Sequence, residues 1–434
     1  MQSSGTRPKL AAVITVYRKY SHAQHICDRF LDGYGWRGDY HYPEMDLVSL
    51  YVDQVGSDDL SRERAARHPG MTIYPTIEQA LTRGTGKLAV DGVILVGEHG
   101  NYPKNEKGQT KYPRYEFFQQ ITSVYRSSQR SVPLFSDKHL SWNWDWAQEM
   151  AATSKSLNFG FMAGSSLPVT WRIPSVEMPM GTQIREALCI CYGGVDSYDF
   201  HGYETVQCMV ERRKGAETGV RSMQAFHGDQ FWKAHAAGVW SKDLFDAALC
   251  RSHTLGQARP GFNDRFPTTA EMRELVKDPY AFNYEHLDGT RCTVLLMNGL
   301  VRDFNFAARL DNPSKIFSTQ MYLPMPDGRT TLATFFSPLA FNMETLFKTG
   351  KSPYPLARTL LTTGLTAAGV ESLHQDQSRI QTPHLSVAYK TPSESFFESA
   401  KGAAAHRQGG QEVASSSGGA LDTAPVLRVF PERS

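Results

Sequence analysis

The sequence predicts an α/β fold: an N-terminal Rossmann-like domain with a doubly wound parallel sheet, followed by a C-terminal α+β domain with a largely antiparallel open sheet. Strand-like and helix-like segments alternate six times up to Pro168, and the strand-like segments are continuous apolar runs. Such runs are typical of strands that helices cover on both faces. After Pro168 the strand-like segments are more polar, which is typical of a sheet with an exposed face.

Each element of the first domain, expected over residues 8–168, follows from a local pattern. The strands are short apolar runs, and the helices show apolar residues at helical spacing. Residues 58–68 also carry acidic residues early and arginines late, as the helix dipole favours. We expect strands at 10–16, 46–52, 72–74, 90–96, 132–135 and 159–163. We expect helices at 22–31, 58–68, 77–83, 115–128 and 145–157.

The second domain is expected over residues 169–390. Its predicted strands are 184–192, 220–226, 292–298, 303–308 and 316–322, and its predicted helices are 203–213 and 358–368. Glycine, serine and alanine dominate the last part of the chain. We therefore expect residues 394–434 to form a disordered tail, because such a composition offers too little apolar surface to bury.

Charge and hydropathy restrict the partners. The 434 residues include 46 basic and 44 acidic ones, a net charge of +2. This balance gives no electrostatic footprint for nucleic acid, and a neutral or anionic small molecule fits it better. No run of about 18 apolar residues and no apolar leader is present, so we expect no membrane partner and a cytoplasmic location.

The most informative segment is Asp137-Lys138-His139, at the end of the predicted strand 132–135. Ligands of open α/β sheets bind in the crevice at the carboxyl ends of the strands. An acid, a lysine and an imidazole at that place therefore indicate a substrate site. The structural alternative for Lys138 is an ion pair with Asp137 or Glu98.

Two further groups are expected to reach the same crevice. The first group, Glu98 and His99, follows the strand 90–96. The second group is Asp199, His201 and Glu204. Imidazoles and carboxylates are ligands for Zn, Mn, Fe or Mg. The expected divalent-metal set is Glu98, His99, His139, Asp199 and His201. Ordinary loop histidines and a capped helix start are the structural alternatives.

His201 and Glu204 stand three residues apart, so a helix that begins nearby would place them on one face. This spacing suits a metal-ligand pair or an acid/base pair. A buried lysine among acids and imidazoles can polarise a carbonyl or act as a base. The expected catalytic residues are Lys138, His201, Glu204 and Asp137.

Several motifs in order resemble the Gfo/Idh/MocA family over about residues 10–375. His22-Ala23 is similar to the family's opening of the first helix, and Asp137-Lys138-His139-Leu140 stands where the family has Glu-Lys-Pro-Leu. Residues 90–96 and 146–164 match its fourth strand, its next helix and its sixth strand. Gly193-Gly194, followed by the acids and the histidine up to Glu204, is similar to its Gly-Gly, Asp, His, Asp signature.

The resemblance implies a sugar- or polyol-acting enzyme with a nicotinamide cofactor. It implies that Lys138 reaches the substrate hydroxyl and the cofactor. It also implies a homo-oligomer built through the open C-terminal sheet.

One departure bears on the cofactor. The family's turn after the first strand is rich in glycine, so that the backbone can approach a pyrophosphate. Here that turn is Val16-Tyr17-Arg18-Lys19-Tyr20-Ser21, without glycine, and we expect its side chains to occupy the pyrophosphate space. Arg18 still supplies positive charge, and Asp53 stands where a ribose-binding acid is expected. The residues expected to bind NAD(P) are Arg18, His22 and Asp53.

Three functions remain open. The first is an enzyme that acts on a sugar, polyol or polyhydroxy carbonyl compound by metal-assisted or acid/base chemistry of the lyase, isomerase or hydrolase type. The second is an NAD(P)-dependent oxidoreductase that transfers a hydride at a sugar or polyol carbon. The third is a scaffold that binds a sugar without catalysis, although unpaired buried charges are unfavourable without a function.

Overall fold

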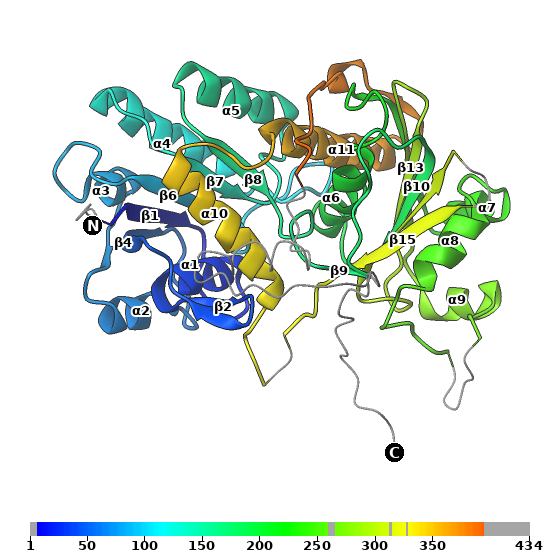
Figure 1. Cartoon of the computed structure of the whole chain (residues 1–434), viewed down its shortest axis with the longest axis horizontal. Helices are drawn as coiled ribbons and strands as arrows, with labels where there is room; N and C mark the ends of the chain where they lie inside the picture. The colour runs from blue at the N-terminus through cyan, green and yellow to red at the C-terminus, as the bar shows by residue number, and fades with distance from the viewer. Residues whose placement is uncertain (1–6, 259–264, 312–314, 327–328, 395–434) are drawn as a thin grey trace, which may run out of the picture.

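The computed structural model describes residues 7–258, 265–311, 315–326 and 329–394. The expected tail therefore lies, from residue 395 onward, outside the described residues. Six strands form a parallel sheet in the order β5-β4-β1-β6-β7-β8 (Figure 1). This is the strand order of a doubly wound sheet, and it confirms the predicted fold class. The strands are β1 (Lys9–Ile14), β4 (Asp46–Val52), β5 (Thr72–Ile73), β6 (Gly92–Val96), β7 (Leu134–Asp137) and β8 (Phe161–Gly164).

The central strands of this sheet are fully apolar because both of their faces are covered. Every residue of β6 is buried, as is every residue of β1 after Lys9. Ser21, Thr76 and Asn143 each accept a hydrogen bond from a backbone N–H of the helix that follows, which fixes three helix starts. The helices are α1 (His22–Asp32), α2 (Ser61–Arg67), α3 (Ile77–Thr82), α4 (Arg114–Ser128) and α5 (Trp144–Ser156).

The second sheet has eight strands in the order β16-β11-β12-β13-β10-β14-β15-β9. Only β10 and β13 pair in parallel, so the sheet is largely antiparallel, as predicted. The strands are β9 (Arg172–Ile173), β10 (Ile184–Cys191), β11 (Val220–His227), β12 (Tyr280–His286), β13 (Arg291–Leu296), β14 (Phe304–Leu310), β15 (Ile316–Met321) and β16 (Ile380–Gln381).

Helices lie on both faces of this second sheet (Figure 1). On one face, Cys189 and Cys191 of β10 belong to the core shared with α6 (Tyr198–Val210) and α11 (Leu356–His374). On the other face, Leu188 and Ile190 pack in a core with α7 (Asp229–Ala236), α8 (Lys242–Leu249) and α9 (Thr269–Leu275). An oligomer through the expected open face would therefore meet these three helices at the centre of the sheet.

Several elements differ from the sequence expectation. The helix α6 begins at Tyr198 rather than at residue 203, and the carboxylate of Asp199 in its first turn accepts hydrogen bonds from the N–H groups of Ser197 and Phe200. The sequence patterns did not predict the hairpin of β2 (Tyr34–Trp36) and β3 (Asp39–His41), the strands β9, β12 and β16, or the helices α7, α8, α9 and α10 (Ser337–Thr349). Within the described residues, no helix combines the length and the apolar character needed to cross a membrane.

Gly164, at the end of β8, lies between the two sheets and has a φ of +116°. A Cβ atom there would lie 2.6 Å from Glu204 Oε1 and 3.1 Å from Thr359 Oγ1. We expect Gly164→Ala to lower the free energy of unfolding by about 3 kcal/mol, through backbone strain and overpacking. Denaturant unfolding measures this change.

Gly289→Ala is the matched control, because Gly289 has a φ of +87° and nothing lies within 4 Å of its added Cβ. This variant should lose only about 1 kcal/mol, the strain of a left-handed alanine. Equal losses in the two variants would contradict the role of the Glu204 contact.

Candidate functional site

Two neighbouring strands, β6 and β7, are each followed by a polar residue whose backbone is left-handed. His99, just after β6, has a φ of +66°, and Lys138, just after β7, has a φ of +67°. Residues other than glycine rarely adopt this conformation, and such strain concentrates at functional sites. Both turns lie at the carboxyl edge of the parallel sheet, where the sequence analysis expected the site.

Glu98 is the acid at the centre of this edge. Its Oε2 accepts a hydrogen bond from Arg114 Nη2 at 2.7 Å, and its Oε1 lies 3.5 Å from Lys138 Nζ. All three side chains are buried. Although burial alone would raise the pKa of Glu98, the charges of Lys138 and Arg114 outweigh it and hold the pKa well below its usual value. The carboxylate is therefore ionised.

Arg114 also fixes the protonation of His139. Arg114 Nη1 lies 3.0 Å from His139 Nε2, and because a guanidinium only donates, this nitrogen accepts. Burial, followed by the Arg114 charge, lowers the pKa of His139 well below its usual value. The neutral ring thus carries its proton on Nδ1, which has no hydrogen-bond partner in the described part of the chain.

His22 and Asp137 form a carboxylate–imidazole pair. His22 Nδ1 lies 2.7 Å from Asp137 Oδ2, and Asp137 is fully buried. The His22 ring contacts the edge of the His99 ring, with centroids 5.5 Å apart. Burial, followed by the charge of His22, lowers the pKa of His99 to about 4, so His99 is neutral near pH 7.

His201 reaches the same place from the second sheet. Its ring centroid lies 5.6 Å from that of Tyr198, and Lys138 Nζ lies over the same tyrosine at 5.5 Å. Burial, followed by the Lys138 charge, lowers the pKa of His201 well below its usual value. His201 Nδ1 has no hydrogen-bond partner among the described residues. A neutral imidazole therefore stands near a buried ammonium group.

The expected metal set does not assemble. Glu98 pairs with cations, His139 accepts from Arg114, and one oxygen of Asp199 accepts from backbone N–H groups at the start of α6. In the described ranges, no group of three His, Cys, Asp or Glu side chains is placed to hold a metal ion. Three of the five expected ligands thus have other partners in the chain, whereas His99 Nε2 and His201 Nδ1 have none among the described residues.

Glu204, an expected catalytic residue, makes its hydrogen bonds within the chain. Its Oε2 accepts hydrogen bonds from Ser165 N at 2.7 Å and from Ser165 Oγ at 2.6 Å, beside Gly164. Burial raises the pKa of Glu204 to about 7. These contacts make Glu204 part of the packing between the end of β8 and α6.

The expected ribose-binding acid, Asp53, is also engaged. Its Oδ1 accepts from the Tyr51 hydroxyl at 2.8 Å, and its Oδ2 accepts from the Tyr102 hydroxyl at 2.7 Å. Each oxygen of this exposed carboxylate thus already accepts one hydrogen bond from a tyrosine. The structure therefore does not show Asp53 free for a cofactor.

The turn between β1 and α1 bonds mainly to itself. Ser21 Oγ accepts from the N–H groups of Gln24 and Arg18, and Gln24 Oε1 accepts from Tyr20 N at 2.6 Å. These N–H groups would otherwise face a pyrophosphate. Tyr17 is buried, and its hydroxyl donates to Asp28 Oδ1 at 2.6 Å.

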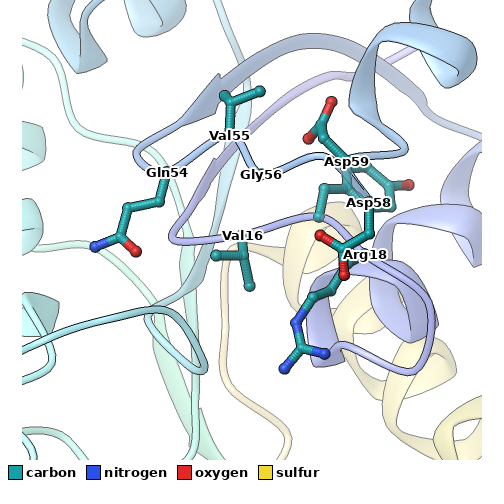
Figure 2. Close-up of a pocket in the computed structure, with 8 residues that line it drawn as sticks. Val16, Arg18, Gln54, Val55, Gly56, Asp58 and Asp59 are labelled. Atoms are coloured by element: carbon teal, nitrogen blue, oxygen red, sulfur yellow. The ribbon is translucent and has the colours of Figure 1, made fainter.

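A pocket of about 320 Å³ lies between this turn and the loop after β4 (Figure 2). Arg18, Asp58 and Asp59 line one side of it, and Gln54 lies on the opposite side. Asp53 is not part of its wall. The pocket is small. Its lining residues do not include Glu98, Arg114 or Lys138.

The sequence analysis missed Arg114 and Tyr198. A cation at the start of a helix opposes the helix dipole, so an arginine as the first residue of α4 signals a specific acidic partner. Arg114 could therefore have been recognised from the sequence as a residue with a buried acidic partner. Nothing local distinguished Tyr198 from a core tyrosine.

The chain was compared with protein-family models, with curated proteins and with solved structures, and only the solved structures match. No protein-family model and no curated protein matches the sequence. Among solved structures, GenD2 from gentamicin A biosynthesis in complex with NAD has a TM-score of 0.53 at 9% identity, covering 88% of this chain and 97% of its own. Myo-inositol 2-dehydrogenase from Lactobacillus plantarum has a TM-score of 0.52 at 10% identity, covering 86% and 99%.

Myo-inositol dehydrogenase from Lactobacillus casei, in complex with NAD(H) and myo-inositol, has a TM-score of 0.51 at 12% identity, covering 87% and 97%. The chain therefore has the two-sheet fold of Gfo/Idh/MocA dehydrogenases, as the sequence resemblance implied. At these identities the likeness concerns the fold.

We expect Arg114→Met to lower the free energy of unfolding by about 3 to 5 kcal/mol, because it leaves Glu98 with only the more distant cation. Arg126→Met, on the exposed side of the same helix, should change it by about 0.5 kcal/mol or less. Denaturant unfolding compares the two. A small effect at Arg114 would show that Lys138 alone compensates Glu98.

The raised pKa of Glu204 predicts a pH dependence. Between its ordinary value of 4.5 and about 7, the folded protein holds a proton that the unfolded chain has released, so stability falls as pH rises. Glu204→Gln should remove this part of the slope, on the order of 2 kcal/mol over the window. Asp199→Asn should act with the same sign, because burial raises the pKa of Asp199 from 3.8 to about 7.

Unfolding titrations at several pH values between 4.5 and 7.5 measure the slope for the wild type and each variant. An unchanged slope in both variants would mean that neither carboxyl group is protonated in the folded protein.

Proposed function

We propose that the protein is an enzyme of the oxidoreductase class that acts at a hydroxyl-bearing carbon of a sugar or polyol. The observation that carries this proposal is the convergence of the Lys138 ammonium group and the neutral His201 ring on Tyr198, at the carboxyl edge of a dehydrogenase fold. The solved neighbours support the class, since two of them are described as myo-inositol dehydrogenases, and GenD2 and one of these two as complexes with NAD or NAD(H).

The two groups have complementary roles in moving the hydroxyl proton. Oxidation of an alcohol breaks its O–H bond, and a neutral imidazole can accept the proton. The depressed pKa of His201 keeps the ring neutral for this purpose. The Lys138 ammonium group stabilises negative charge that develops on the oxygen. In the reverse direction the same proton returns from His201 to the oxygen.

The His22–Asp137 pair supplies a second imidazole in a fixed orientation. Because its Nδ1 lies 2.7 Å from Asp137 Oδ2, Nε2 is the ring nitrogen that remains for other contacts. The arrangement suits a hydrogen bond to a neighbouring substrate hydroxyl. We assign this orienting role to His22 in place of the cofactor-binding role expected from the sequence.

Buried polar atoms around the cluster favour a hydroxyl-rich ligand. Within the described residues, His99 Nε2, Asp137 Oδ1, His139 Nδ1 and His201 Nδ1 are buried without a hydrogen-bond partner. Buried groups of this kind are normally satisfied, so their concentration at one place calls for an explanation. A polyol offers several donors and acceptors at once, and a purely apolar ligand offers none.

A nicotinamide cofactor, when bound, accepts or donates the hydride in such a reaction. The residues here do not fit the usual way of holding one, because the β1–α1 turn uses its N–H groups internally and Asp53 is paired with two tyrosines. We therefore derive no step through it. The same observation favours a second candidate, a proton-transferring isomerase or lyase that uses the same residues.

The test combines a panel of polyols and sugars, including myo-inositol, with NAD⁺, with NADP⁺ and with no nucleotide, in deuterated water. Nucleotide-dependent formation of a carbonyl, followed by NMR and by nucleotide absorbance, is the expected result. Deuterium incorporation at carbon without nucleotide would favour the second candidate. Binding without turnover would favour a sugar-binding scaffold.

Lys138→Met and His201→Asn should each lower turnover by about a hundredfold or more, because they remove the charge and the proton acceptor. Lys155→Met is the matched control, since Lys155 is exposed on α5 and should leave turnover unchanged. Full turnover in Lys138→Met would overturn the proposal.

A further inference from the structure

His139, the residue after Lys138, is a further polar group beside the proposed proton-transferring residues. The two are equally buried, with 2% of each residue exposed. The His139 ring packs against the ring of Phe200, with centroids 5.5 Å apart, and Phe200 directly precedes His201 on α6. Besides burial and the charge of Lys138, the His139 ring contributes to the lowered pKa of His201. His139 therefore lies close to both Lys138 and His201.

Arg114 fixes which nitrogen of His139 carries the proton. Arg114 Nη1 lies 3.0 Å from His139 Nε2, and a guanidinium can only donate, so Nε2 accepts. Glu98 holds the other terminal nitrogen of Arg114, Nη2, at 2.7 Å, and this ion pair is buried. The neutral His139 ring is therefore a donor at Nδ1, and it stays one as long as Arg114 keeps its place.

This donor has no partner within the chain. His139 Nδ1 is buried and has no acceptor among the described residues. Buried donors are normally satisfied, and leaving one unpaired is unfavourable. A ligand oxygen that accepts a hydrogen bond would satisfy it. His139 thus complements His201, because one ring is fixed as a donor and the other is proposed to accept a proton.

We propose that His139 Nδ1–H and the Lys138 ammonium group form a pair of donors to the substrate oxygen on which negative charge develops. This inference rests on the proposed function. When His201 takes the hydroxyl proton, the electron pair of the O–H bond stays on that oxygen, and the two fixed donors stabilise it. In the isomerase or lyase candidate, the electron pair moves onto a carbonyl oxygen, so the same two donors serve either reaction.

The role predicts an effect on turnover rather than on binding. A hydrogen bond to an oxygen becomes stronger as the oxygen gains negative charge. The His139 contact is therefore worth more in the transition state than with the bound substrate, and its loss should lower kcat more than it raises KM.

Two amide replacements separate this role from a structural one. The amide of glutamine reaches the position of Nε2 and can still accept from Arg114, but it places no donor at the position of Nδ1. The amide of asparagine reaches the position of Nδ1 and can donate there, but it leaves Arg114 without this acceptor. His139→Gln and His139→Asn therefore each keep one of the two contacts.

We expect His139→Gln to lower kcat about a hundredfold and to change KM by less than about threefold, because one donor to the developing charge is lost. His139→Asn should keep kcat within about fivefold of the wild type, although its melting temperature should fall further than that of His139→Gln. A structural role alone predicts the reverse order of kcat, because it depends on the Arg114 contact. Circular dichroism checks that both variants are folded.

NMR of the protein labelled with ¹⁵N at its 14 histidines tests the tautomer without a need for turnover. The signals of His139 are those that disappear in His139→Gln. Near pH 7 we expect a neutral ring with the proton on Nδ1 and none on Nε2, because burial, followed by the Arg114 charge, lowers the pKa of His139.

Three results would overturn the proposal and leave the proposed function intact. They are a His139 ring without a proton on Nδ1, a wild-type kcat in His139→Gln, and a kcat that is lower in His139→Asn than in His139→Gln. A wild type that turns over none of the sugars and polyols, with or without nucleotide, would instead remove the proposed function and this role of His139 with it.

Discussion

The ionised Glu98 carboxylate between two buried cations is the constraint on which the site depends. Arg114 approaches it from the start of α4 and Lys138 from the end of β7. Removing a charge from water is unfavourable unless a partner compensates it, so each of the three groups requires the others. The position of the ammonium group near His201 follows from this arrangement.

This charge cluster gives the left-handed turns after β6 and β7 a physical reason. A residue other than glycine holds such a backbone only when its surroundings fix it. His99 packs against His22 and brings a neutral ring to the site, while Lys138 is fixed by Glu98 and the face of Tyr198. The strain at the two strand ends is thus offset by contacts that also assemble the proton-transferring groups.

The fold and the site carry different information about function. The two sheets are those of dehydrogenases, yet a fold supports many reactions and the chemistry belongs to the site. The lysine and the histidine that the family resemblance implied do come together at the carboxyl edge of the sheet. The turn before Ser21 and the acid Asp53, in contrast, make their hydrogen bonds within the chain. The residues proposed to move a proton thus lie together, whereas those expected to bind a cofactor are engaged within the chain.

The sequence by itself determined the parallel sheet, because apolar runs and helical spacing are local signals, and it placed Lys138 and His139 correctly at a strand end. For the turn before α1, the sequence showed that glycine is absent, but it did not show that the turn bonds to itself. Which partner each charged group takes was decided by the tertiary structure. Asp53 meets Tyr102 across 49 residues, and His22 meets Asp137 across 115. A carboxylate accepts a hydrogen bond from whichever donor the fold brings nearest. Local sequence patterns cannot predict which distant donor that will be.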